Sequence, residues 1–291
     1  MTSPRPRRAT DQAMVDADRA CREISRRHGV SYFWASQLLA RDQRRHVHAL
    51  YALCRRADDI VDQVDGADAA ARRGDLLGFR ARFDEALATG HSDDRVLVAA
   101  ARTVHEFELD PSLFDRFFAA MASDLDISRY DTWDDLVVYM DGSAAAIGEM
   151  LLPVLAPTDP AAALEPARSL GLAFQLTNFL RDVDEDLDLG RQYLPQAELR
   201  AFGVDLAERR VTPDFVELMR FQIERCRELY AIAAEGEQWL PPRSARCVRT
   251  ARGLYGAILD RIEDADFDVF AGRVSVPTGD KLRIVAAELR R

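Results

Sequence analysis

The sequence predicts an all-α fold, and two observations carry this prediction. Apolar residues recur in steps of three and four along most of the 291-residue chain, which is the period of an amphipathic helix. Alternating runs of β-branched residues bounded by Asn-Gly or Asp-Gly turns, the usual signature of strands, are almost absent. Turn-forming prolines and glycines separate the helical stretches, at Asp110-Pro111, Pro153 to Pro160, Gly190 with Pro195, and Pro241-Pro242.

The helical period predicts about ten helices without an internal repeat. The clearest is QRRHVHALYALCRRADDIVDQVD, residues 43–65, where Leu50, Leu53 and Ile60 lie on one apolar face. The other stretches with this period are 11–27, 68–89, 93–107, 111–126, 133–152, 161–189, 213–238 and 243–265. Since the connections are short and composition does not change across them, we expect one domain over residues 11–291.

Composition and charge restrict the class of function. Hydrophobic residues make up 48% and charged residues 30%, which is typical of a globular protein with a sizeable core. The net charge of −10 argues against a broad basic surface, so no nucleic-acid partner is expected. The basic segment MTSPRPRRAT lacks a following apolar run, so residues 1–10 are predicted to be a disordered tail and not a secretion signal.

The cysteine pattern favours a cytoplasmic location. The four cysteines show no CxxC or zinc-finger spacing, and they are Cys21, Cys54, Cys226 and Cys247.

The most apolar run, GSAAAIGEMLLPVLAP, contains Glu149 and Pro153 and is shorter than the roughly 20 residues that a membrane-spanning helix needs.

A first group of carboxylates lies in YALCRRADDIVD, residues 51–62. On a helix, Asp58 and Asp62 are one turn apart and share a face, with Tyr51 and Arg55 on the same polar stripe. Such a pair is also typical of a solvated helix face, so this motif alone is weak support for a metal site.

A second group lies in QLTNFLRDVDEDLDLGRQYLP, residues 175–195. Asn178, Asp182 and Asp186 are spaced one turn apart, and Mg²⁺ prefers oxygen ligands of this kind. Apolar residues fill the other faces, which predicts a buried helix whose polar stripe faces a cavity. Of the remaining acidic residues, Glu185 is expected to support this row of metal ligands. Asp184 and Asp188 are expected to be exposed to solvent.

Together the two stripes predict a divalent-metal site for diphosphates, with the two helices facing each other across a cleft. Arginine and tyrosine donors suit the anionic oxygens that metal ions leave uncovered. The second motif supplies three such donors, which are Arg181, Arg191 and Tyr193.

In this order and context, the two motifs resemble those of the squalene/phytoene synthase family, and the resemblance runs from about His28 to Val276. The segments MASDLDISRYDTWDDLVVYMDGSAAAIGEMLLPVL and ARGLYGAILDRIEDADFDVFAGRVSVP look like the family's central region and its C-terminal helix with the following loop. The resemblance implies an isoprenoid synthase helical bundle around a central cavity. One departure is Ala145, which stands where the family's small-residue helix break often has glycine.

The resemblance also implies roles for matching residues. Those expected to bind Mg²⁺, with Mn²⁺ as a substitute, are Asp58, Asp62, Asn178, Asp182 and Asp186. Those expected to contact the diphosphates or to close over them are Tyr51, Arg55, Arg181, Arg191, Tyr193, Tyr255 and Arg273. Gln175 and Tyr139 would lie near the reacting carbons. As the catalytic set we take the four aspartates with Tyr51, Arg55 and Gln175.

The reaction implied by the resemblance is the head-to-head joining of two prenyl diphosphates through a cyclopropylcarbinyl diphosphate, with release of diphosphate. The motif wording resembles bacterial phytoene synthases, and the small Ser36 on a presumed wall helix favours geranylgeranyl over farnesyl diphosphate. The expected product is then phytoene, made without NADPH in carotenoid biosynthesis. Squalene or dehydrosqualene synthesis from farnesyl diphosphate, another prenyl synthase or terpene cyclase reaction, and a non-catalytic assembly factor stay open as alternatives. A lipophilic product suggests a cytoplasmic protein at the inner face of the membrane, near other carotenoid enzymes.

Overall fold

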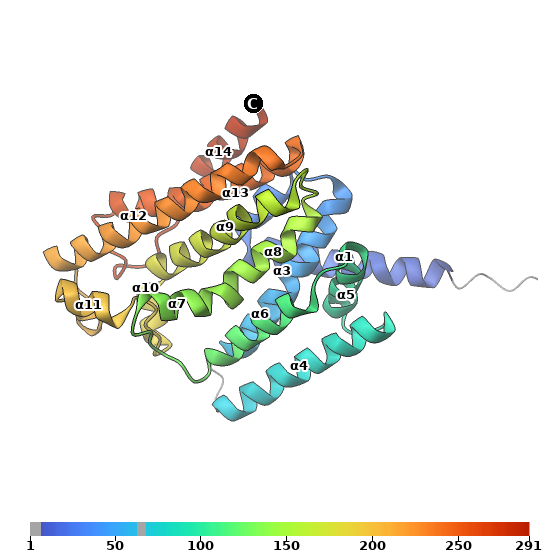
Figure 1. Ribbon diagram of the computed structural model, residues 1–291, viewed down its shortest axis with the longest axis horizontal. Coiled ribbons are helices and arrows are strands. Elements are labelled where there is room, and N and C mark those ends of the chain that lie inside the picture. Colours follow the sequence, from blue (N-terminus) through green and yellow to red (C-terminus); the bar gives the residue numbers. More distant parts are fainter. Residues whose placement is uncertain (1–6, 63–67, 291) are drawn as a thin grey trace, which may run out of the picture. The chain divides into compact units, whose positions relative to one another are not determined.

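The computed structural model describes residues 7–62 and 68–290, and it confirms the all-α prediction (Figure 1). Within these residues there are fourteen α-helices and no strand, and one isolated bridge joins Arg129 to Gln192. Residues 1–6 of the predicted disordered tail lie outside the described residues, and residues 7–10 belong to the first helix.

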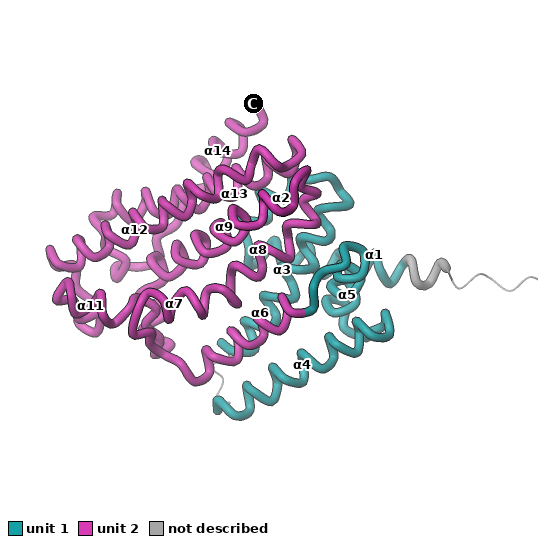
Figure 2. The backbone as a smooth tube through the Cα atoms, in the orientation of Figure 1, with its two compact units in different colours: residues 1–111 teal, residues 112–291 magenta. Residues whose placement is uncertain are grey.

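The chain divides into two compact units, residues 1–111 and 112–291, which are coloured separately in Figure 2. The prediction of a single domain stays a prediction. The helices of the first unit are α1 (Arg7–His28), α2 (Val30–Ser36), α3 (Arg41–Val61), α4 (Ala69–Thr89) and α5 (Arg95–Phe107).

The second unit contains most of the predicted site residues and the two longest helices, α12 and α13. Its helices are α6 (Pro111–Ser123), α7 (Trp133–Met140), α8 (Ala146–Val154), α9 (Pro160–Arg181), α10 (Val183–Asp188), α11 (Gln196–Phe202), α12 (Pro213–Glu235), α13 (Pro242–Asp264) and α14 (Thr278–Arg290). A π-helical turn (Asp141–Ala145) joins α7 to α8, and 3₁₀ turns cover Leu206–Glu208 and Gly236–Trp239.

The expected helix starts coincide with prolines and side-chain caps. Helices α9, α12 and α13 carry proline in their first turn, where the missing N–H has no helical partner to lose. Asp159 and Thr212 cap α9 and α12 by accepting bonds from the backbone N–H of Ala162 and Phe215. These local signals explain why sequence and structure agree on where the long helices begin.

Two helices predicted as continuous are broken in the structure. The stretch 133–152 is interrupted by the π turn, and the stretch 161–189 ends and restarts at Asp182, whose φ of −102° and ψ of 18° are not helical. Periodicity misses both breaks because the apolar pattern continues across them. Helix α2 is the short helix on which Ser36 was expected, whereas α11 and α14 were not predicted, since α11 has only seven residues and α14 follows a proline-containing loop.

Helix α9 is the buried centre of the second unit, as its apolar surroundings in the sequence predicted. It packs against α8, α12 and α13, and Leu176, Thr177 and Leu180 are completely buried (Figure 1). The stretch Trp133–Val154 is long and apolar enough to qualify as a membrane-crossing helix by length and composition. Its most apolar window is 56% buried within the protein, which fits a core helix equally well.

Candidate active site

The first carboxylate motif lies at the end of α3, in the first unit. Asp62 is the C-cap residue, and its N–H donates to the Asp58 carbonyl at 2.9 Å, so the two aspartates remain one turn apart. Arg55 bonds to Asp58 at 3.1 Å and to Asp59 at 2.5 Å. Burial disfavours the Arg55 cation, but the two carboxylates outweigh this cost and raise its pKa.

Tyr51 of the same motif depends on a glycine that the sequence did not single out. A Cβ atom added to Gly29 would lie 2.5 Å from the Tyr51 ring and 2.7 Å from its hydroxyl oxygen. Tyr51 also contacts Tyr32, with ring centroids 5.8 Å apart. Gly29 therefore leaves the space in which the Tyr51 ring lies.

The second carboxylate motif spans the break between α9 and α10, in the second unit. The Asp182 N–H donates to the Asn178 carbonyl at 2.8 Å, and the Asp186 N–H donates to the Asp182 carbonyl at 2.8 Å. These bonds keep the spacing of one turn even though the helix ends at Asp182. Asn178, Asp182 and Asp186 thus retain the spacing that the sequence predicted.

Two arginines bind the Asp182 carboxylate, whose side chain is only 14% exposed. Arg181 bonds to it through Nε at 2.7 Å, and Arg273 through Nη2 at 3.1 Å. Burial disfavours the Arg181 cation, but its bond to Asp182 and the nearby Tyr255 and Glu185 raise its pKa. Arg273 also reaches Glu185 at 3.3 Å, so the loop after α13 lies against the second motif.

The other two acidic residues of this segment point to a different partner. Asp184 and Asp188 bind the exposed Arg209 at 2.7 and 2.5 Å. They are not simply solvated, but their partner differs from the arginines that hold Asp182. Four of the five acidic residues therefore form two pairs with separate arginine partners, Asp182 with Glu185 and Asp184 with Asp188.

Arg191 and Tyr193 are held in place by backbone pairing between two loops. The Gln192 N–H donates to the Ser128 carbonyl at 2.7 Å, and the Gln196 N–H donates to the Tyr130 carbonyl at 2.9 Å. The Arg191 N–H donates to the Asp186 carbonyl at 2.8 Å, which ties this loop to the end of α10. As a result the Arg191 side chain, a predicted diphosphate ligand, is buried beside the second motif.

Four aromatic rings form a continuous group around Tyr193. The Tyr193 and Phe179 rings stack with centroids 3.9 Å apart, and Tyr139 and Tyr130 lie within 6.0 Å of the same ring. Burial raises the pKa of Tyr139 and Tyr193 well above the usual tyrosine value, and the charge of Asp124 adds to the effect. Both phenols therefore stay protonated and can act as hydrogen-bond donors.

Asp124 is the acceptor for these phenols, and the sequence did not identify it. The Tyr139 hydroxyl donates to Asp124 Oδ2 at 2.6 Å, and the Tyr193 hydroxyl lies 3.4 Å from Oδ1. Asp124 follows α6 in MASDLD, a segment that the resemblance covered without assigning a role to this residue. Asp124 contacts two predicted site residues because three segments that are distant in the chain meet there.

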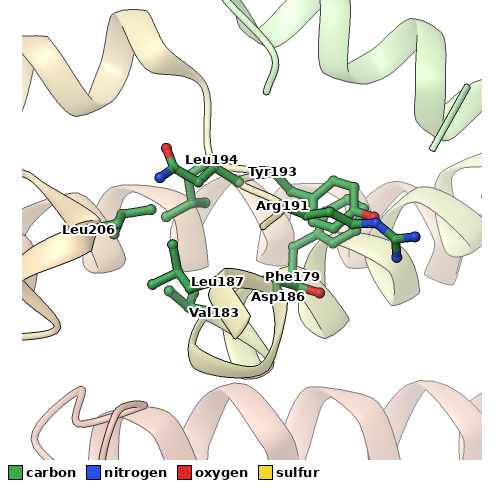
Figure 3. Close-up of a pocket in the computed structure, with 9 residues that line it drawn as sticks. Phe179, Val183, Asp186, Leu187, Arg191, Tyr193, Leu194 and Leu206 are labelled. Atoms are coloured by element: carbon green, nitrogen blue, oxygen red, sulfur yellow. The ribbon is translucent and has the colours of Figure 1, made fainter. Parts of the chain in front are cut away.

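A shallow pocket adjoins the second motif (Figure 3). Arg191, Tyr193 and Phe179 lie together on one side of it, whereas Val183, Leu187, Leu194 and Leu206 line the other. Asp186 belongs to the same lining. The pocket thus places one carboxylate of the stripe beside an arginine and an apolar wall.

Tyr255 and Gln175 complete the predicted residues of the second unit. Tyr255 of α13 is buried and contacts Phe174, with ring centroids 4.4 Å apart, and Phe174 also contacts Tyr230. Gln175 lies half-buried on α9, next to Phe174 in the chain.

The structure places the predicted residues in two sets, one for each unit. Tyr51, Arg55, Asp58 and Asp62 belong to the first unit, and the remaining ones to the second. The prediction that the two carboxylate stripes face each other stays a prediction.

The helix break next to Tyr139 is closely packed although Ala145 replaces a glycine. A Cβ atom on Gly171 of α9 would lie 2.4 Å from the Ala144 carbonyl oxygen. Gly171 on the facing helix therefore allows the two backbones to approach closely, although Ala145 is not glycine.

The donors of the second motif suit a hard divalent cation. Asn178, Asp182 and Asp186 offer only oxygen ligands, and Asp182 already attracts two cationic groups. Among residues 12–62 and 68–290, no three His, Cys, Asp or Glu side chains converge on one point. Magnesium is commonly bound through one or two carboxylates, with waters and substrate phosphates completing its shell, so the described residues fit such an ion.

Comparison with known proteins agrees with these features. Residues 25–280 match the family model described as squalene/phytoene synthase. A phytoene synthase of Arthrospira platensis is 36% identical over 99% of this chain and 97% of its own length, and a 15-cis-phytoene synthase of Synechococcus elongatus is 35% identical over 97% and 95%.

Solved structures give the same result at the level of fold. The crystal structure of a dehydrosqualene synthase superposes with a TM-score of 0.87 at 25% identity, covering 96% of this chain and 97% of its own. A squalene synthase of Alicyclobacillus acidocaldarius superposes with a TM-score of 0.77 at 28% identity, covering 88% and 96%. The family prediction and the isoprenoid synthase fold are thereby confirmed, and the chain belongs to the squalene/phytoene synthase family.

Proposed function

We propose that the protein is a phytoene synthase, a prenyltransferase that joins two geranylgeranyl diphosphates head to head. The observation that carries this proposal is the 36% identity to a phytoene synthase over 99% of the chain. The local geometry supports it, because the second motif keeps its oxygen ligands in line and has Arg181, Arg191 and Arg273 around them.

The arginines would bind the diphosphate that leaves when the allylic substrate ionises. Arg181 is largely buried and already paired with Asp182, so its charge is held in position before a substrate arrives. Arg191 is fixed through its own backbone, and Arg273 lies on a loop that could close over the site. Fixed cations of this kind stabilise a developing anion without reorganisation during the reaction.

A divalent metal ion, proposed to be Mg²⁺ with Mn²⁺ as a substitute, would act as a Lewis acid on the diphosphate oxygens. Asn178, Asp182 and Asp186 of the second motif would hold such ions, and Asp58 and Asp62 of the first motif are proposed as metal ligands as well. Arg273 and Arg181 neutralise Asp182 in the structure, so binding of a metal ion would require Asp182 to share or exchange these partners.

The buried aromatic group would exclude water from the carbocation. Tyr139, Tyr193 and Phe179 form a stacked wall that meets the apolar side of the pocket at Val183 and Leu187. Gln175 and Tyr139 are the residues proposed to lie nearest the reacting carbons.

Purified protein incubated with Mg²⁺ and either geranylgeranyl or farnesyl diphosphate tests the assignment. Phytoene from geranylgeranyl diphosphate, without NADPH, is the expected product. A product from farnesyl diphosphate alone would replace this assignment with squalene or dehydrosqualene synthesis, and a cyclic or head-to-tail product would replace it with another prenyl synthase or cyclase.

Two alternatives have less support. The likeness to a dehydrosqualene synthase structure supports the use of farnesyl diphosphate at the level of fold. Ser36 is no evidence against farnesyl diphosphate, because its hydroxyl is buried and contacts His48 at 2.9 Å. A non-catalytic assembly factor is disfavoured, since every predicted ligand position still carries Asp or Asn.

We also propose a cytoplasmic protein that contacts the inner membrane face transiently. The exposed Leu282 and Leu289 of α14, beside Lys281 and Arg283, suit a surface of anionic lipid. Sedimentation with anionic vesicles should weaken in Leu282→Glu/Leu289→Glu and not in Leu77→Glu, which changes an even more exposed leucine of α4. Equal sedimentation of both variants would rule out this surface.

A further inference from the structure

Four charged residues surround the π turn between α7 and α8. Arg116 of α6 bonds to the Asp141 carboxylate through Nε at 2.8 Å and Nη2 at 2.7 Å, and to Glu149 at 2.9 Å. Arg168 of α9 bonds to Asp141 at 2.7 Å and also to Glu149. Each arginine therefore binds both carboxylates, and the four side chains form a closed ring across three helices and the turn.

The ring is possible only because the turn is π-helical. In a regular α-helix, residues eight apart point about 80° away from each other. The π turn accommodates one extra residue, so Asp141 and Glu149 stand as if seven apart, within about 20° of the same direction. Both carboxylates then reach the same two guanidinium groups.

Arg116 also binds the backbone of the turn. The Asp141 carbonyl accepts the Ala146 N–H, which is the five-residue bond that defines the π turn, and Arg116 Nη2 donates to the same carbonyl at 3.3 Å. Two glycines permit the tight packing: a Cβ atom on Gly142 would lie 2.4 Å from the Arg116 carbonyl oxygen, and one on Gly171 would meet Ala144. Glycines allow the approach but supply no attraction, whereas the ion pairs do.

The register of this turn decides where Tyr139 points. Tyr139 lies on α7, two residues before Asp141, and its hydroxyl reaches Asp124 at 2.6 Å. If the turn relaxed to an α-helix, α7 would rotate by about 100° and shift by about 1.5 Å relative to α8. The Tyr139 hydroxyl would then leave Asp124 and the aromatic group.

We propose that Arg116 and Arg168 are positioning residues, which hold the π turn in register and so keep Tyr139 directed into the site. The side chains of this ring are 15 to 33% exposed, so one isolated pair would contribute little. A closed set of charge-assisted and partly bidentate bonds is stronger and more directional. The expected effect on activity rests on the proposed function, whereas the expected effect on the rotation of α7 does not.

Trp133 reports the rotation of α7 without any substrate. Its ring lies 4.0 Å below the Arg225 guanidinium, so a turn of α7 would separate the two groups. In a Trp34→Phe/Trp239→Phe background, Trp133 is the only tryptophan left, since the chain has three. Fluorescence and acrylamide quenching then measure its surroundings.

Arg168→Gln in this background is the test variant, and Glu165→Gln is its matched control. Glu165 contacts Arg168 at 3.6 Å but is 72% exposed and does not belong to the ring. We expect Arg168→Gln to remain helical, to change Trp133 emission and quenching, and to lower kcat by about 10²-fold with little change in KM. Glu165→Gln should match the parent protein in every measurement.

Unchanged Trp133 emission in folded Arg168→Gln overturns the inference, and so does a changed emission with unchanged kcat. Should Arg168→Gln fail to fold, Asp141→Asn removes the ion pairs that Asp141 makes with Arg116 and Arg168 at nearly constant volume, and it gives the same readouts. If the parent protein turns over no prenyl diphosphate, the proposed function fails, and the Trp133 signal alone decides whether the ring holds the turn.

Discussion

The two carboxylate motifs differ in what holds them. On α3, Arg55 pairs with Asp58 and Asp59, three and four residues away on the same helix, and these carboxylate side chains are 43% and 39% exposed. At the break between α9 and α10, Asp182 is 14% exposed and is bound by Arg273, 91 residues later in the chain. The ion pairs of Arg55 in the first motif are local, whereas Asp182 of the second motif is also bound through a tertiary contact.

This difference explains which residues the sequence could identify. Spacing along a helix predicted the Asp58–Asp62 pair and the Asn178–Asp182–Asp186 stripe, since both depend on the helical period alone. Spacing predicted no break at Asp182 or near Ala145, and the family resemblance implied a helix break near Ala145 without indicating a π turn. In both places the apolar pattern continues while the backbone changes.

Asp124 and Gly29 could not be predicted for a related reason. Asp124 meets Tyr139 and Tyr193 only because the loop after α6 pairs with the loop after α10. Gly29 matters because the Tyr51 ring, from another helix, fills the space beside it. Neither contact leaves a periodic signal in the sequence.

The comparison predicts the largest loss of activity from Asp182→Ala, in the second motif. Its removal deletes a proposed metal ligand and leaves Arg181 and Arg273 without their shared carboxylate. We expect kcat with geranylgeranyl diphosphate to fall on the order of 10³-fold while circular dichroism stays helical. Asp188→Ala, which removes only a partner of Arg209, should keep the parent's kcat, and equal losses in both would contradict the division of the acidic residues.

A smaller loss is expected for Asp124→Asn, which tests the residue that sequence missed. The amide keeps the size of the side chain but removes the charge that accepts the Tyr139 and Tyr193 hydroxyls. By analogy with groups that orient primary ligands, kcat should decrease about 10- to 100-fold. Steady-state kinetics should compare this variant with Asp126→Asn, which changes an exposed neighbour. An equal kcat for the two variants would show that Asp124 does not orient the two tyrosines.

A change near the first motif should act mainly on binding. Gly29→Ala pushes the far end of the Tyr51 ring and no backbone atom, so the fold should persist while the Tyr51 hydroxyl moves. We expect KM to rise several-fold, about tenfold at most, which corresponds to 1.4 kcal/mol or less. Gly78→Ala on α4, where an added Cβ meets no atom within 4 Å, should leave KM as it is. A KM unchanged in both variants would show that Tyr51 does not contact the substrate.

The smallest effect is expected for Arg209→Gln. Arg209 is exposed and binds Asp184 and Asp188, and salt bridges at the surface contribute little to stability. Turnover and melting temperature should both match the parent protein. A marked loss of turnover would mean that Asp184 or Asp188 belongs to the site after all.

We infer that the motif at the α9–α10 break binds diphosphate together with a divalent metal ion. Calorimetric titration with inorganic diphosphate, with and without Mg²⁺, measures this binding in the absence of catalysis. We predict Mg²⁺-dependent binding to the parent protein and to Asp188→Ala, and its loss in Asp182→Ala. Binding to Asp182→Ala as tight as to the parent protein would show that Asp182 does not hold the metal ion and the diphosphate.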